Sequence, residues 1–215
     1  MKLKTNIKYG LVLIGTLCML SCLELANEIS NWSDYDNIDQ ISGKYHVLDE
    51  DGVKLFLPDE FDRLPYISYK KVLDSVMSKK AFNYESARLR NLREMEGHLY
   101  IFFDEITRST VTVNTMPYTP LSRDDAQYLL GMIKLGNDKI SDELGINIEK
   151  VTARYKDGVH AQIFKAIYKI DDDKKLATVY NSTYIITSNS GKTLFIQLVT
   201  PFEVDFDPFL QKMII

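Results

Sequence analysis

The chain has 215 residues, of which 45% are hydrophobic, enough for one domain with a full core. It carries 26 Lys and Arg residues against 30 Asp and Glu residues, a formal net charge of −4. Nucleic acid is bound chiefly by Lys and Arg side chains that neutralise phosphates. The acidic balance therefore argues against nucleic acid as a partner.

Residues 1–21 are typical of a secretory signal. Lys2, Lys4 and Lys8 precede an apolar run, Tyr9–Leu20, which is too short for a helix that must cross about 30 Å of hydrocarbon. Without those lysines the chain has 23 basic and 30 acidic residues, a net charge of −7. We expect the leader to be removed and an acidic protein to be exported.

The end of this leader resembles the lipobox of bacterial lipoproteins, in which a small residue precedes a cysteine that is lipidated. Here Ser21 precedes Cys22. The resemblance implies that Cys22 is the lipid attachment residue and that the protein is anchored to a membrane of the cell envelope, on the periplasmic or outer-membrane side. Two or more acyl chains hold a protein firmly. Cys18 leaves with the leader, so no disulfide is expected. An ordinary cleavage near Ser21 or Ala26, or an uncleaved anchor, is the alternative.

An acidic segment, residues 22–42, separates the signal from a domain predicted to span residues 43–215. The segment has no sustained apolar period, and we interpret it as a tether. Its acidic run Asp34–Asp39 resembles a calcium loop in part. It lacks the glycine at the sharp turn, and Tyr45 stands where the twelfth ligand belongs, so no metal is expected.

The first half of the domain predicts a hairpin, two helices and two strands. The hairpin spans Lys44–Leu57 and has an Asp-Gly turn signal at its tip. Ser68 is expected to cap a helix that runs to about Lys80, and a more charged helix follows over Tyr84–Met95. The strands are expected at His98–Asp104 and Ser109–Met116.

The second half predicts a long helix, a four-stranded meander and a short last helix. The long helix begins at a cap, Ser122, and ends at Gly145. Short turns separate the strands and force antiparallel pairing; the strands are expected at residues 146–155, 159–170, 176–188 and 193–200. Asp207 is expected to cap the last helix, with Leu210, Met213 and Ile214 facing the sheet.

This order of elements resembles the PsbP/DcrB-like superfamily. The resemblance is carried by Gly52–Pro58, Tyr155–Gly158 and Gly191–Pro201. It implies an α+β fold with an antiparallel sheet of about six to seven strands and helices on both faces, an α/β/α sandwich. It also implies an accessory or binding protein, since members include lumenal photosystem subunits, bacterial envelope lipoproteins, a nuclear import factor and secretion chaperones, and most are not enzymes.

The sequence contains few groups suited to catalysis. Its three histidines, His46, His98 and His160, stand singly on predicted strands and form no zinc motif. We find no nucleophile elbow, phosphate loop or dinucleotide fingerprint, so no enzymatic activity and no cofactor are expected. A Ser-His-Asp triad built from distant residues leaves an envelope hydrolase as one alternative. A secretion chaperone or immunity-type protein that binds a toxin is another.

Basic and aromatic residues gather on the two helices expected before the central strands. Such a surface suits an acidic protein partner of unknown identity or anionic lipid headgroups. The candidate partner surface comprises Tyr66, Tyr69, Lys70, Lys71, Arg88, Arg90 and Arg93. The alternative is a pair of solvated helix faces.

Lipidation at Cys22 predicts that cells expressing the full chain incorporate labelled palmitate into it. The variant Cys22→Ala should abolish this incorporation, because no other cysteine survives removal of the leader, and Cys18→Ala should leave it unchanged. Mass spectrometry of the purified protein is the second measurement. An unprocessed Met1, or a cleaved product with an unmodified amino terminus, would contradict the prediction.

Overall fold

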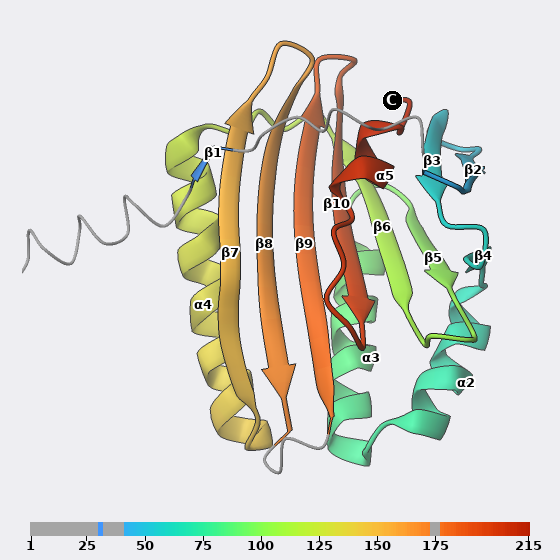
Figure 1. The fold of residues 1–215 in the computed structure, drawn as a ribbon, viewed down its shortest axis with the longest axis vertical. Coiled ribbons are helices and arrows are strands. Elements are labelled where there is room, and N and C mark those ends of the chain that lie inside the picture. Colours follow the sequence, from blue (N-terminus) through green and yellow to red (C-terminus); the bar gives the residue numbers. More distant parts are fainter. Residues whose placement is uncertain (1–29, 32–40, 173–176) are drawn as a thin grey trace, which may run out of the picture.

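The computed structural model describes residues 30–31, 41–172 and 177–215 (Figure 1). The predicted signal, the predicted lipid attachment residue Cys22 and the whole run Asp34–Asp39 lie outside the described residues. None of the helices in the described part of the chain is long and apolar enough to span a bilayer.

An eight-stranded sheet forms the centre of the molecule, in the order β1-β7-β8-β9-β10-β6-β5-β4 (Figure 1). Its strands are β1 (Ser30–Asn31), β4 (Asp62–Arg63), β5 (Leu99–Phe103), β6 (Thr110–Pro117), β7 (Asn147–Asp157), β8 (Ala161–Asp171), β9 (Thr178–Ser188) and β10 (Lys192–Thr200). All neighbours pair antiparallel except β1, which pairs parallel to β7. Seven antiparallel strands, β4 to β10, confirm the predicted fold class and the meander.

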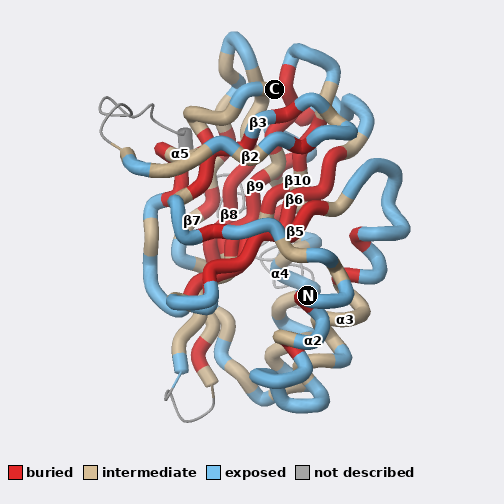
Figure 2. Tube along the Cα trace, turned by 90° about the vertical axis from the view of Figure 1, so that its right-hand side faces the viewer, coloured by how far each residue is buried: buried red, intermediate tan, exposed pale blue. Residues whose placement is uncertain are grey.

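The sheet separates two differently covered faces, because successive side chains of a strand point to opposite sides. One row of paired positions crosses the sheet through Ile101, Thr112, Gln197, Thr183, Ala166 and Ala153. This helix face is covered by α2 (Tyr66–Val76), α3 (Lys79–Glu94) and α4 (Arg123–Leu144). The opposite side, the hairpin face, is covered by the β2–β3 hairpin (Lys44–Leu48 and Val53–Leu57) and α5 (Asp207–Gln211). Buried residues accordingly concentrate along the strands (Figure 2).

The boundary between α2 and α3 differs from the prediction. Helix α2 begins directly after Pro65, which needs no backbone donor there, so Ser68 lies inside the helix and does not cap it. Ser78 caps α3 instead, and its hydroxyl accepts a hydrogen bond from the Ala81 N–H at 3.3 Å. The predicted helix to Lys80 was wrong because both serines carry the same capping signal, and the second one starts a new helix.

Helix α4 forms as predicted. Ser122 and Asp125 make a capping box, in which the Asp125 N–H donates to the Ser122 hydroxyl at 3.1 Å and the Ser122 N–H donates to the Asp125 carboxylate at 2.9 Å. The helix ends at Gly145, whose φ of 66° is the left-handed conformation that glycine adopts without a steric penalty.

Helix α5 is fastened to the hairpin face by a buried ion pair. Asp207 Oδ1 lies 2.6 Å from Lys165 Nζ and accepts a hydrogen bond from the Tyr184 hydroxyl at 3.1 Å. The two charged side chains are 6% and 4% exposed. Burial raises the pKa of Asp207, while Lys165 acts in the opposite direction. The prediction that Asp207 caps the helix was wrong: α5 has no side-chain cap, because this carboxylate binds Lys165.

The residues after α5 run alongside the hairpin. The Lys54 N–H donates to the Ile214 carbonyl at 2.8 Å, and the Ile214 N–H donates to the Lys54 carbonyl at 2.9 Å. Leu210 and Met213 pack into the core as expected. Ile214 does not, because this backbone pairing leaves its side chain 50% exposed.

The buried pair predicts that Lys165→Met destabilises the protein strongly. Removing the ammonium leaves a buried carboxylate without its counter-ion, a change that costs about 3–5 kcal/mol. The free energy of unfolding from urea denaturation measures the effect. Lys139→Met is the control, since Lys139 forms an exposed pair with Glu143 on α4 and its loss should change stability far less. Equal stability of the two variants would contradict a role for Lys165 in holding α5.

Candidate functional site

Two hollows lie on the hairpin face, one on each side of α5. The first, which we call the apolar pocket, has a volume of about 310 Å³. It is lined by Pro58, Glu60, Phe61, Asp104, Ile106, Thr107, Ser109, Leu198, Thr200, Phe202, Val204, Phe206 and Phe209. The second, the C-terminal pocket, has a volume of about 280 Å³ and lies where α5 and the chain end meet β8 and β9.

Three segments form the mouth of the apolar pocket: residues 58–61 between β3 and β4, 104–109 between β5 and β6, and 200–206 from the last residue of β10 to the start of α5. The buried side chains of Leu198 and Phe206 contribute the interior. Ile106 and Phe202 stand at the outside and are 84% and 45% exposed. Large exposed apolar residues next to an apolar cavity mark a contact site more strongly than isolated ones.

Internal hydrogen bonds fix the loops around this mouth. The buried Asp104 carboxylate accepts a hydrogen bond from the Ile106 N–H at 2.8 Å and another from the Thr107 hydroxyl. The Asp104 N–H donates to the Ser109 carbonyl at 2.9 Å, which closes the β5–β6 loop. The Thr200 hydroxyl donates to the Phe202 carbonyl at 2.5 Å. The pocket is therefore formed in advance of binding, as small-ligand and anchor pockets usually are.

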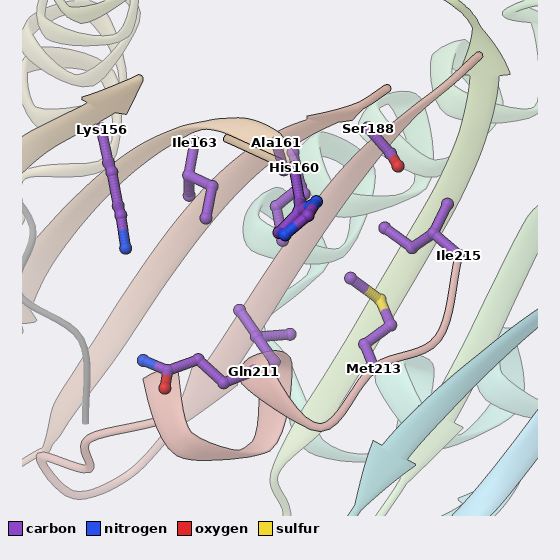
Figure 3. A pocket seen from close by; sticks show the side chains of 10 residues that line it. Lys156, His160, Ala161, Ile163, Ser188, Gln211, Met213 and Ile215 are labelled. Atoms are coloured by element: carbon purple, nitrogen blue, oxygen red, sulfur yellow. The ribbon is translucent and has the colours of Figure 1, made fainter. Parts of the chain in front are cut away.

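The C-terminal pocket brings together polar and apolar groups (Figure 3). His160 from the β7–β8 turn, Ser188 from the end of β9 and Gln211 from α5 line it together with Lys156. The Ser188 hydroxyl accepts hydrogen bonds from the Ser190 N–H at 3.2 Å and from the Ser190 hydroxyl at 3.0 Å. Among the described residues His160 makes no hydrogen bond to Ser188, so the nucleophile–base contact that a serine hydrolase needs is not formed.

A polar cluster joins the tip of the hairpin to the sheet. The Tyr100 hydroxyl lies 2.7 Å from an oxygen of Glu50 and 2.7 Å from an oxygen of Asp51. Asp51 also accepts a hydrogen bond from the Thr115 hydroxyl at 2.9 Å and lies 3.2 Å from His98 Nδ1. The cluster therefore connects β5 and β6 to the turn between β2 and β3.

Gly97 allows the chain before β5 to lie close to β6, which brings His98 to the polar cluster. Its φ is 106°, and a Cβ atom at this position would lie 1.5 Å from the Thr115 carbonyl oxygen. The chain therefore passes close to β6 before it enters β5, and His98, the next residue, reaches Asp51.

The ionisation of the cluster follows from these contacts. Burial raises the pKa of Asp51, but hydrogen bonds from Tyr100, Thr115 and His98 outweigh it and hold that pKa below its ordinary value of 3.8. Burial and the two adjacent carboxylates raise the pKa of Tyr100. Glu50, Asp51 and His98 offer ligand atoms within 4.8 Å of one another, a set of the kind that zinc uses. Their existing hydrogen bonds explain the cluster as a link between hairpin and sheet.

The three histidines thus occupy separate places. His98 belongs to the polar cluster and His160 lines the C-terminal pocket. His46 lies on β2, where its ring contacts Phe102 edge-on at a centroid distance of 4.8 Å. Burial, followed by the charge of Lys44, lowers the pKa of His46. No two of the histidines share a site.

The predicted basic surface is divided by the fold. Tyr69 is buried, and its hydroxyl donates to Thr110 at 3.1 Å, so it presents no surface. Arg88 lies on α3 and is half-buried, and its guanidinium donates to both oxygens of Glu85 and to the side-chain oxygen of Gln197. These two residues hold α2 and α3 on the sheet.

The other five residues of the predicted surface remain accessible. The Arg93 guanidinium lies 4.5 Å from the ring centroid of Tyr66, and the Lys70 ammonium lies 5.7 Å from that of Phe82. Lys71 and Arg90 are exposed as well. A partner surface on these helices therefore stays a prediction for Tyr66, Lys70, Lys71, Arg90 and Arg93.

Sequence reasoning missed the apolar pocket. Its mouth is built from connecting segments, for which the sequence patterns predicted no helix or strand. A signal was nevertheless present, since Phe61, Phe202, Phe206 and Phe209 fall in or beside segments that are otherwise rich in acidic residues and prolines. Aromatic side chains in such connections need a core or a partner to cover them.

The seven antiparallel strands, with helices on one face and a hairpin and α5 on the other, define a PsbP-like α+β fold. The solution structure of cyanobacterial PsbP (CyanoP) from Synechocystis sp. PCC 6803 is similar to this chain with a TM-score of 0.50 and 13% sequence identity. The match covers 86% of this chain and 98% of that one. No family model and no curated protein matches the sequence. At this identity the similarity shows the fold alone, and it confirms the fold that the resemblance implied.

The polar cluster predicts that Tyr100→Phe lowers the free energy of unfolding at neutral pH by about 1–3 kcal/mol, because a carboxylate loses a buried donor. The folded-state pKa of Asp51 lies below its ordinary value of 3.8, so the ionised carboxylate stabilises the fold at pH values above 3.8. This stabilisation is lost as the pH falls through the folded-state pKa. The difference between variant and native protein should therefore narrow below pH 3.8.

Urea denaturation at a series of pH values measures this difference. Tyr45→Phe is the control, since the Tyr45 hydroxyl donates to the uncharged carbonyl of Lys212. Its effect should stay constant over the same pH range. A pH-independent effect of Tyr100→Phe would contradict the assignment.

Proposed function

We propose that the protein is a lipid-anchored cell-envelope protein whose folded domain acts as a non-enzymatic binding or accessory module. The observation that carries this proposal is the apolar pocket, which has preformed walls and two exposed apolar residues at its mouth. Such a pocket suits recognition of an apolar group. The Asp104 carboxylate and the Thr107 hydroxyl in its lining bond to each other and hold the β5–β6 loop.

The anchor in this proposal rests on the sequence. A positive start, a short apolar run and Ser21 before Cys22 support export and lipidation. The PsbP-like fold supports the second half of the proposal in general terms, because the superfamily that the chain resembles contains mostly accessory proteins. A secretion chaperone or immunity-type protein is a narrower version of the same function, in which the bound partner is a toxin or secreted client.

The hydrolase alternative has one observation in its favour. His160 and Ser188 line the same C-terminal pocket (Figure 3). It would need the Ser188 hydroxyl to exchange its bonds with Ser190 for one with His160. The binding module needs no rearrangement, and we prefer it for that reason.

Site-specific photo-crosslinking in intact cells tests the proposal. A photoreactive phenylalanine analogue in place of Ile106, or in place of Phe202, should yield the same covalent adduct, because both side chains stand at the pocket mouth. The control places the analogue at Tyr128, which is 69% exposed on α4, on the other face of the sheet. It should yield no such adduct.

A second variant ties the adduct to the pocket. With the analogue at Ile106, the additional change Phe202→Glu should reduce the adduct strongly, since a carboxylate at the mouth opposes apolar contact. Cells in which neither mouth position forms an adduct, although the protein is present at the membrane, would refute binding at this pocket.

A further inference from the structure

Acidic residues dominate the three segments that surround the apolar pocket. Residues 58–61, 104–109 and 200–206 contain six acidic residues and one basic residue, Arg108. Each segment contributes an exposed glutamate that lies in or next to the pocket lining: Glu60, Glu105 and Glu203. Negative charge thus encircles an apolar cavity.

The cavity itself is shaped for a bulky apolar side chain. Its volume of about 310 Å³ is at the lower end of ligand pockets. Phe206 and Phe209 stack within it with their ring centroids 5.4 Å apart. Ile106 and Phe202 extend the apolar surface outward from the mouth. An anchor side chain inserted in such a pocket, inside a polar rim, is the arrangement that dominates the energy of protein interfaces.

The negative charge of the glutamates around the mouth indicates which kind of molecule carries the apolar group that binds in the pocket. Carboxylates at the mouth attract Lys and Arg and repel anionic lipid headgroups, and salt weakens this selection because the three glutamates are exposed. The chain's own tether is disfavoured by the same charge, because Trp32 in it is followed by Asp34, Asp36 and Asp39.

We propose that the apolar pocket binds a segment of a partner protein in which a bulky apolar side chain is flanked by Lys or Arg. This inference rests on the proposed function and names the class of partner for the same site. The apolar side chain enters between Phe206, Phe209 and Leu198, while the flanking cations pair with Glu60, Glu105 and Glu203. The carboxylates contribute selectivity and association rate, and the cavity contributes most of the affinity.

A peptide array tests this with the full-length protein held in nanodiscs of uncharged phosphatidylcholine. The peptides carry a central Phe, Leu or Ser, flanked on both sides by two Lys, two Gln or two Glu residues. Peptides with an apolar centre and Lys flanks should bind at least about tenfold more tightly than those with a Ser centre or Glu flanks. High salt should reduce the preference for Lys flanks.

Three variants separate the contributions. Phe202→Ser should weaken every peptide with an apolar centre by about tenfold. The triple variant Glu60→Gln, Glu105→Gln, Glu203→Gln should remove the preference for Lys over Gln flanks and keep the preference for Phe over Ser. The matched control Tyr128→Ser, which removes an exposed aromatic side chain on α4, should change neither.

The remaining outcomes overturn the inference in distinguishable ways. Equal binding of Lys-, Gln- and Glu-flanked peptides would refute the basic partner. Competition by phosphatidylglycerol vesicles that depends on Phe202 would assign the pocket to lipid. If no peptide binds while crosslinking at Ile106 still succeeds, the partner class is wrong and the proposed function stands. Failure of both would remove the proposed function as well.

Discussion

The buried contact between Lys165 and Asp207 fixes where α5 lies, and both hollows of the hairpin face depend on that place. Hydrophobic contacts hold a short helix on a sheet without specifying its position, because they are non-directional. An ion pair with 6% and 4% exposure tolerates little displacement, since separating its charges in a low-dielectric interior is costly. The Tyr184 hydroxyl donates a hydrogen bond to the Asp207 carboxylate from a second direction. The apolar pocket and the C-terminal pocket are the spaces that remain on either side of a helix held in this way.

The side chains of β6 alternate between the two faces of the sheet, and the two faces have different roles. Val111 and Val113 point to the hairpin face, whereas Thr112 and Asn114 point to the helix face. Two polar side chains on the helix face bond within the protein: the Asn114 amide donates to the Leu92 carbonyl at 2.9 Å, and the Arg88 guanidinium donates to Gln197 on β10. Long helices cover that side, while a short hairpin and a five-residue helix cover the other. Open apolar space therefore falls on the hairpin face.

Local signals in the sequence were sufficient for most of the fold. The Asp-Gly hairpin, the Ser122 cap, Gly145 and the short turns of the meander act over a few residues, so they can be recognised without tertiary information. They failed where two positions carried the same signal, as with Ser68 and Ser78, or where a distant partner decided the outcome. Asp207 resembles a cap until Lys165, 42 residues earlier in the chain, is known to lie beside it. Tyr69 and Arg88 resemble surface residues for the same reason. The apolar pocket joins three segments far apart in sequence, and no local pattern predicts which connections meet.

The proposed lipidation of Cys22 would constrain how the apolar pocket is presented. Seven residues separate Cys22 from Ser30, and Ser30 pairs with Arg154 on β7. An extended chain of that length spans about 25–30 Å, so a lipid on Cys22 would hold the sheet edge near the bilayer. The pocket lies across the sheet, among the connections of β3, β5 and β10. Anionic headgroups repel a mouth surrounded by glutamates, whereas a basic segment is attracted to it. Under the proposed lipidation, a tether that joins the sheet at β7 and an acidic mouth on the opposite strands would together turn the pocket away from the membrane and toward the proposed protein partner.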